Sequence, residues 1–376
     1  MLRPITIEAF SDVHMGHSTT SAKKIYEEIR TCFPLDKNTH SDILVLAGDW
    51  WDKLLPINHP DSYETVSAIF YLLNYVKKTN KTLLIVDGTP LHDSGQIQMF
   101  KTINEHAKIN ADVVLVDDID IVYIAKYDIH VLFVPDRPRV SPMATIARVH
   151  ELLKEKQIES VDMAVMHGCF QYQLPQIADD HKHKESDYLD IVKGPIIIGH
   201  IHKHSVFERI IAPGSFSRLT HGEEEPKGYV RIEMKTPTEY TATFIENKDA
   251  TVFITVDVTN LEMAESLALI DKKIRNLPEG SRVRIQCQAK HPLASDKDFM
   301  EMKLRYLDLH FTMKVTNNKD IVEEEKTLFD TLEDYQPLII NKQNITDLIL
   351  ERCANASNSV LKAIPEAMNE IMKEVR

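Results

Sequence analysis

Cysteine is scarce in this sequence, and long apolar runs are absent. The four cysteines, Cys32, Cys169, Cys287 and Cys353, lie far apart and form no C-x-x-C motif, which excludes a disulfide framework and a cysteine-based zinc knuckle. No segment approaches the roughly 18 apolar residues that a membrane-spanning helix requires. We therefore expect a cytoplasmic protein that does not enter a membrane.

Glycine is also scarce, and positive charge is in deficit. With 11 Gly and 17 Pro, 43% hydrophobic and 27% charged residues, the composition is that of a folded globular protein and excludes a disordered or collagen-like chain. The 44 Lys and Arg residues are outnumbered by 57 Asp and Glu residues, and the net charge of -13 argues against a broad basic face for nucleic acid. If the protein acts on DNA, a partner must help to hold the DNA.

Short apolar segments alternate with amphipathic segments through the first two thirds of the chain. The apolar segments predict strands at residues 5–10, 42–47, 82–86, 113–116, 129–134, 162–166 and 196–198. Apolar residues at helical spacing predict helices at residues 21–33, 63–76 and 143–157. Alternation of this kind is typical of a layered α/β domain.

The pattern along the chain also predicts where domains begin and end. Hairpin-like strands within residues 229–245 complete a first domain, residues 1–247. A small α/β module follows at residues 248–318, and the polar stretch 319–343 is predicted to be a linker. Residues 344–376 are predicted to be helical.

The 17 histidines are the one abundant feature, and histidine is the commonest metal ligand. Asp and His clusters follow five predicted strands: Asp12 and His14, Asp49, His92 and Asp93, His167, and His200 and His202. Open α/β sheets place ligand and catalytic groups at these strand ends. Each cluster alone could be an ordinary turn or a surface histidine, but the ordered set predicts a site for Mn²⁺, Fe or Zn²⁺, which accept mixed carboxylate and imidazole ligands.

The ordered series D-x-H, G-D-x-x-D, G-x-x-x-H-D, H-G and G-H-x-H resembles the calcineurin-like metallophosphoesterase superfamily. Residues 12–16, 48–52, 213–218 and 227–229 are similar, more narrowly, to the SbcD type of DNA-repair nuclease. The matching motifs cover about residues 4–245. The resemblance implies an α/β fold, in which a two-sheet α/β sandwich metallophosphoesterase domain precedes a small α/β capping domain and a C-terminal helical segment.

The resemblance also implies a role for each matched residue. The implied metal ligands are Asp12, His14 and His202 for one ion, Asp49 as the bridge, and His167 and His200 for the other ion. Two divalent ions roughly 3.5–4 Å apart would clamp a phosphate and generate a hydroxide for attack on phosphorus. His92 would assist at the leaving-group oxygen, and Asp93 would orient His92. Mn²⁺ is the expected metal, with Fe, Zn²⁺ and Mg²⁺ as alternatives.

The third motif departs from the family pattern. The family sequence is G-N-H-D, in which Asn supplies a carbonyl oxygen to the second metal, whereas here Thr89, Pro90 and Leu91 separate Gly88 from His92. Thr89 could contribute its hydroxyl as a ligand or support the ligands, or a water could take the position. We therefore expect the second metal to bind more weakly than the first.

Several residues outside the ligand set are candidates for other roles. His17, Ser215 and Arg218 could contact a phosphate or DNA, although His17 could equally be an ordinary surface histidine and the other two could stabilise a loop. Trp50 and Trp51 are predicted to pack in the interior rather than to stack on a base.

The resemblance implies a metal-dependent DNA nuclease, whether exonuclease or endonuclease, that acts in DNA repair or recombination with an SbcC-like coiled-coil ATPase. The helical tail would bind this partner, or else pack on its own domain, through the apolar residues Ile345, Leu348, Ile349, Leu361, Ile364 and Met368. A homodimer is also implied, with residues 63–76 as a candidate surface. The alternatives are a metallophosphoesterase of a phosphoprotein or nucleotide, and a non-catalytic scaffold that retains the fold.

Overall fold

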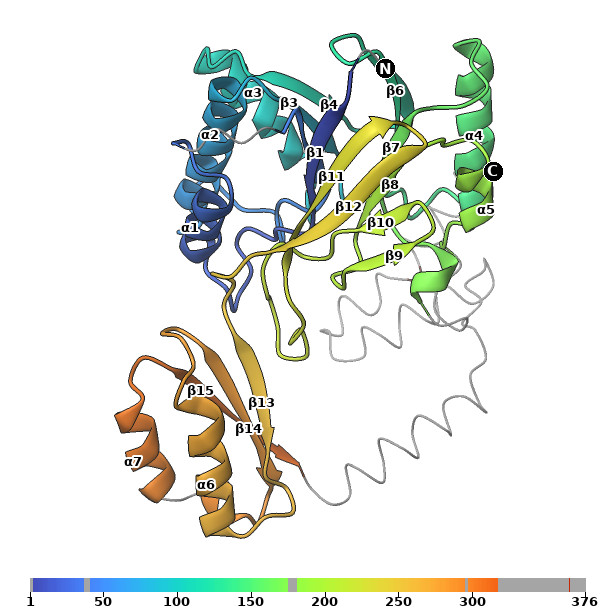
Figure 1. The fold of residues 1–376 in the computed structure, drawn as a ribbon. Helices are drawn as coiled ribbons and strands as arrows, with labels where there is room; N and C mark the ends of the chain where they lie inside the picture. The colour runs from blue at the N-terminus through green and yellow to red at the C-terminus, as the bar shows by residue number, and fades with distance from the viewer. Residues whose placement is uncertain (1–2, 37–40, 175–180, 295–296, 317–364, 366–376) are drawn as a thin grey trace. The chain divides into compact units, whose positions relative to one another are not determined.

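The computed structural model describes residues 3–36, 41–174, 181–294, 297–316 and 365 (Figure 1). Within these residues, none of the helices combines the length and the apolar character that crossing a membrane would need. The predicted linker and the helical tail fall outside this part of the chain, apart from Pro365. The same is true of the expected partner-binding residues Ile345, Leu348, Ile349, Leu361, Ile364 and Met368.

Six strands form the first sheet, in the order β12-β11-β1-β2-β3-β4. Their bounds are β1 (Ile5–Phe10), β2 (Ile43–Ala47), β3 (Thr82–Val86), β4 (Asp112–Val116), β11 (Gly228–Thr236) and β12 (Glu239–Glu246). Strands β1 to β4 are parallel, and the β11–β12 hairpin extends the sheet antiparallel to β1. Every residue of β2 and β3 is buried, as expected for parallel strands that are covered on both faces.

Six further strands form the second sheet, in the order β5-β6-β7-β8-β10-β9. Their bounds are β5 (Asp120–Ile124), β6 (Ile129–Val134), β7 (Met163–His167), β8 (Ile196–Gly199), β9 (Ser205–Phe207) and β10 (Ile210–Ala212). The central strands β6, β7, β8 and β10 are parallel, whereas the edge strands β5 and β9 pair antiparallel to their neighbours.

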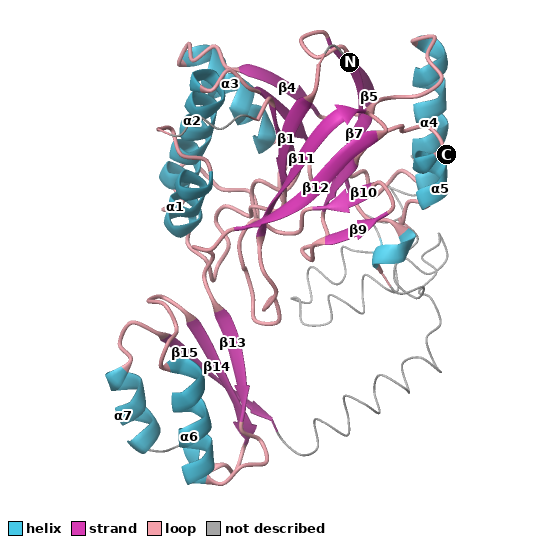
Figure 2. Cartoon of the chain, viewed as in Figure 1, coloured by secondary structure: helices cyan, strands magenta, loops and turns pink. Residues whose placement is uncertain are grey.

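Helices cover the outer faces of both sheets (Figure 2). The helices of the first sheet are α1 (Ala22–Cys32), α2 (Ser62–Lys78), η1 (Gln96–Gln98) and α3 (Met99–His106), and those of the second are α4 (Pro142–Glu155), η2 (Gln171–Gln173) and α5 (Glu185–Leu189). Two helices begin at serine N-caps, because the Ser21 and Ser141 side chains accept hydrogen bonds from the first-turn amides of Lys24 and Ala144.

The apolar core lies in three layers, one between the sheets and one under the helices of each sheet. Strand β2 contributes to two of them, since Ile43, Val45 and Ala47 face the second sheet while Leu44 and Leu46 face α1 and α2. The observed architecture is therefore an α/β sandwich of two mixed six-stranded sheets, and the predicted fold class is confirmed.

A third, smaller sheet lies within the module predicted at residues 248–318. It contains β13 (Phe253–Asp257), β14 (Arg282–Gln288) and β15 (His310–Thr316), together with α6 (Met263–Ile274), η3 (Pro292–Ala294) and α7 (Lys297–Arg305). Alternate residues of β14 are buried, and with α6 and α7 they enclose a separate apolar core. One face of this sheet is therefore covered by helices.

Candidate metal centre

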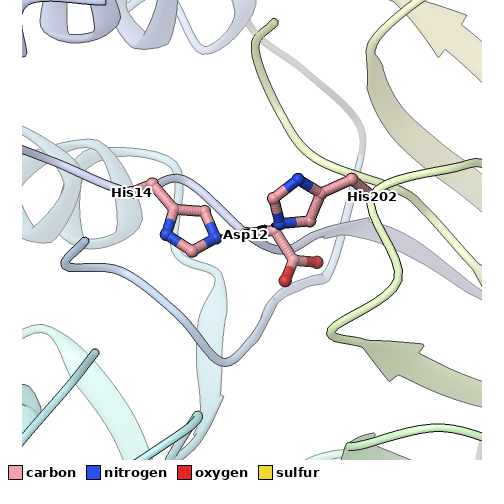
Figure 3. A group of neighbouring side chains, drawn as sticks. All are labelled: Asp12, His14 and His202. Atoms are coloured by element: carbon pink, nitrogen blue, oxygen red, sulfur yellow. Dashed lines mark hydrogen bonds between the residues drawn. The ribbon is translucent and has the colours of Figure 1, made fainter. Parts of the chain in front are cut away.

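The first group of predicted ligands is brought together by the loops that follow β1 and β8. Ligand atoms of Asp12, His14 and His202 all lie within 4.8 Å of one another (Figure 3). The Nε2 atoms of His14 and His202 are 3.1 Å apart, and both oxygens of Asp12 accept from the backbone N–H of His200, at 3.0 and 3.1 Å. Two imidazole nitrogens and a carboxylate that converge in this way could hold a metal ion.

The second group joins the ends of β2, β7 and β8. Ligand atoms of Asp49, His167 and His200 also lie within 4.8 Å of one another. Asp49 Oδ2 is 3.2 Å from His167 Nε2 and 3.9 Å from His14 Nε2, so this carboxylate lies between the two groups. His167 Nδ1 is 2.7 Å from the carbonyl oxygen of Ala47, and because a carbonyl only accepts, Nδ1 carries the hydrogen and Nε2 faces Asp49.

Thr89, which follows Gly88 in the third motif, lies at the second group. Its hydroxyl oxygen lies 3.2 Å from Asp49 Oδ2 and 3.3 Å from both His167 Nε2 and His200 Nδ1. Its backbone N–H also donates to Asp49 Oδ1 at 2.6 Å. The hydroxyl is thus within reach of every member of the second group. Whether the second metal binds more weakly stays a prediction.

His92 and Asp52 lie beside both groups. Ligand atoms of His92, His14 and Asp49 form a third set within 4.8 Å, and His92 Nδ1 donates to the backbone carbonyl of Asp52. The carboxylate of Asp52 lies 3.5 Å from His14 Nδ1 and 4.0 Å from His17 Nε2, which places His17 at the edge of the centre. No role for Asp52 was predicted from the sequence, although Asp52 occupies the last position of the G-D-x-x-D motif.

Asp93 has a different role from the one predicted. Its side chain is fully buried and accepts three backbone hydrogen bonds, from Asp49 at 3.2 Å, Trp51 at 3.1 Å and Gly88 at 2.9 Å. No hydrogen bond among the described residues joins Asp93 to the His92 ring. The prediction that Asp93 orients His92 is therefore wrong, because the turn directs Asp93 inward while the ring of His92 is held by a carbonyl. Asp93 instead fixes the second and third motif loops.

The backbone at the centre is strained. Asp12, His14, Asp49 and His200 all have positive φ angles, of 51°, 51°, 53° and 99°. Non-glycine residues rarely adopt this region, and each instance costs of the order of 1–3 kcal/mol. A Cβ atom on Gly48 would lie 2.2 Å from His167 Nδ1, so the loop can pass this ring only with glycine there. Backbone strain of this kind gathers at functional sites.

Electrostatics favour a cation at the second group. Burial opposes ionisation of Asp49, but the neighbouring His167 holds the Asp49 pKa below its ordinary value. Burial alone would lower the pKa of His167, whereas the carboxylate of Asp49 raises it to about 10. Burial lowers the pKa of His200, which is therefore neutral near pH 7. Asp49 and His167 thus share a proton that a metal ion would replace.

Residues around the ligands hold the loops. Ser215 is fully buried, and its backbone N–H donates to the carbonyl of His202 at 3.0 Å. The Arg218 guanidinium donates to a backbone carbonyl at 3.3 Å. These contacts favour the loop-stabilising alternative for both residues. Trp50 and Trp51 are buried in the core, which confirms that they pack in the interior.

Comparisons with known proteins find distant structural neighbours. No family model and no curated protein matches the chain. It aligns with the crystal structure of TT1561 of Thermus thermophilus over 65% of this chain and 99% of that chain, at 11% identity and a TM-score of 0.37. It aligns with GAP50, the anchor in the inner membrane complex of Plasmodium, over 66% and 87%, at 12% identity and a TM-score of 0.39. The two sheets and the buried ligand groups themselves fit a phosphoesterase-like fold.

Proposed function

We propose that the protein is a metal-dependent DNA nuclease that hydrolyses phosphodiester bonds, similar to SbcD-type subunits. The observation that carries this proposal is the pair of buried His and Asp groups joined by Asp49, with His92 beside them. Mn²⁺ is the metal we expect there, with Fe, Zn²⁺ and Mg²⁺ as alternatives, because the ligands combine carboxylate oxygen with imidazole nitrogen.

The side chains of the centre have separable tasks in such a reaction. Divalent cations held by the two groups would supply positive charge to the phosphate and lower the pKa of water. Asp49 fixes the spacing of the two groups, because it approaches a histidine of each. The Nδ1–H of His92 is engaged by the carbonyl of Asp52, so Nε2 is the nitrogen free to pass a proton to the leaving oxygen.

The partners in this proposal are DNA, an SbcC-like ATPase and a second copy of the chain. The net charge of -13 supports a need for the ATPase, since another subunit would have to supply much of the basic surface for DNA. Helix α2 supports the dimer, because Tyr63 and Phe70 are 76% and 48% exposed and lie on one face, two helical turns apart.

The test is Mn²⁺-dependent degradation of linear double-stranded DNA by the full chain, with and without the ATPase. Asp49→Ala should lose both metal binding and cleavage, whereas His92→Ala should lose cleavage and keep the metal. Hydrolysis of bis-p-nitrophenyl phosphate without cleavage of DNA would indicate a phosphoesterase of another substrate. A chain that binds metal at neither group and hydrolyses neither compound would be a scaffold, and the proposal would be wrong.

A further inference from the structure

A carboxylate outside the predicted ligand set contacts one of the candidate ligands. Glu223 Oε1 lies 2.8 Å from Nδ1 of His202, and Glu223 Oε2 accepts from the backbone N–H of Leu219 at 2.9 Å. Only 15% of the Glu223 side chain is exposed. Both carboxylate oxygens are therefore engaged, and the ring of His202 is held at the nitrogen that points away from His14.

The same loop also holds the backbone of His202. The ammonium group of Lys227 donates to the carbonyl of His202 at 2.8 Å and to Glu225 Oε1 at 2.8 Å, and it lies 3.7 Å from Glu223 Oε2. The Lys227 side chain is only 1% exposed. Residues 219–227 thus hold both the ring and the backbone of one ligand, which fixes its position relative to Asp12.

The contact with Glu223 determines which nitrogen of His202 faces the centre. An ionised carboxylate only accepts hydrogen bonds, so Nδ1 carries a hydrogen and the lone pair of Nε2 is directed at the first group. Histidines that bind metals commonly donate their other N–H to a carboxylate or carbonyl, which orients the ring and makes it a stronger ligand.

At the second group, the acceptor behind His167 is a neutral carbonyl oxygen rather than a carboxylate. His167 donates through Nδ1 to the neutral carbonyl of Ala47, and the ligand atoms next to it include the neutral hydroxyl of Thr89. A carboxylate acceptor polarises an imidazole more strongly than a carbonyl does, because it carries a full charge. The two groups therefore differ in the support behind their ligands.

We propose that Glu223 is a positioning residue that makes the group of Asp12, His14 and His202 the tighter of the two metal sites. The inference rests on the proposed function only for the presence of cations at the centre, and it concerns binding rather than cleavage. It predicts that loss of the Glu223 charge weakens one metal site selectively.

The experiment is a titration of the full-length chain with Mn²⁺, in which free Mn²⁺ is followed by electron paramagnetic resonance. Glu223→Gln keeps a hydrogen-bond acceptor and removes the charge, whereas Glu223→Ala removes both. Loss of such an outer support typically costs about 10- to 100-fold in metal affinity. We expect the tighter site to weaken about 10-fold in Glu223→Gln and more in Glu223→Ala, with the weaker site unchanged.

Two further variants separate positioning from a general structural role. Glu223→Asp retains the charge and should recover part of the lost affinity, and Glu224→Gln makes the same chemical change at the exposed neighbouring residue and should have no effect. Unchanged tight binding in Glu223→Ala, or equal weakening of both sites, would overturn the inference. A wild-type chain that binds Mn²⁺ but leaves DNA intact would refute the nuclease instead, because the affinity comparison does not depend on cleavage.

Discussion

Metal binding at the second group should release a proton, and its affinity should therefore depend steeply on pH. Asp49 raises the pKa of His167 to about 10, so below that pH the pair retains a proton that a metal ligand cannot carry. Affinity should rise about tenfold per pH unit, which from about pH 6.5 to about pH 8.5 amounts to roughly 100-fold or about 2.7 kcal/mol. His200 adds no proton, because its pKa is lowered by burial.

The assay is calorimetric titration with Mn²⁺ in two buffers of different ionisation enthalpy, which counts the protons released. His202 also has a raised pKa, so His14→Ala, which disables the first group, isolates the second. Adding His167→Ala in this background should abolish the remaining binding. Binding that releases no proton and keeps one affinity across this range would refute the assignment of a shared proton to Asp49 and His167.

Three further predictions concern Thr89, Glu28 and the C-terminal segment. Thr89→Asn should tighten Mn²⁺ binding at the second site roughly tenfold, because an amide oxygen would replace a hydroxyl that lies 3.2–3.3 Å from three ligand atoms. Equal or weaker Mn²⁺ binding in this variant would count against Thr89 as the cause of a weak site. Burial raises the pKa of Glu28 from 4.5 to about 7 despite its hydrogen bond with Asn247. The free energy of unfolding should therefore fall by about 3 kcal/mol as the pH rises from about 4.5 to about 7, because Glu28 loses its proton more easily in the unfolded chain. Glu28→Gln should remove this fall in stability, which is measured by comparing urea unfolding at about pH 5 and about pH 8. An unchanged pH dependence in the variant would contradict the role of Glu28. Deletion of residues 340–376 should abolish co-purification with the SbcC-like ATPase while the Mn²⁺ titration stays unchanged, and retained co-purification would rule out the tail as the binding segment.

The central strands could be predicted because burial on both faces leaves a continuous apolar run. Strands β1, β3 and β6 were predicted with their observed bounds, and β2 and β7 to within a residue. Strand β5 and helix α3 were not predicted. Strand β5 is an edge strand of mixed burial that begins among aspartates, and α3 has only 8 residues and buries only Phe100, so each offers a short pattern from which to predict an element.

The ligands could be predicted because each lies in a short motif that follows a strand, and parallel strands bring such motifs to one edge. The residues that support the ligands could not be predicted, because Glu223 contacts His202 from 21 positions further along the chain. The direction of Asp93 was predicted wrongly for a related reason. A turn can direct neighbouring side chains to opposite sides, and only the surrounding backbone amides decide which carboxylate is buried.

The two ligand groups have similar donors but unequal surroundings. At the first group, Glu223 supports His202, and the carboxylate of Asp52 lies 3.5 Å from Nδ1 of His14. At the second group, His167 is supported by a neutral carbonyl, and Thr89 offers a neutral hydroxyl. A cation at the first group therefore has the carboxylates of Glu223 and Asp52 directly behind two of its histidines. We therefore expect unequal metal affinity at the two groups even with an amide at residue 89, so Thr89→Asn should narrow the difference in affinity between the sites without removing it.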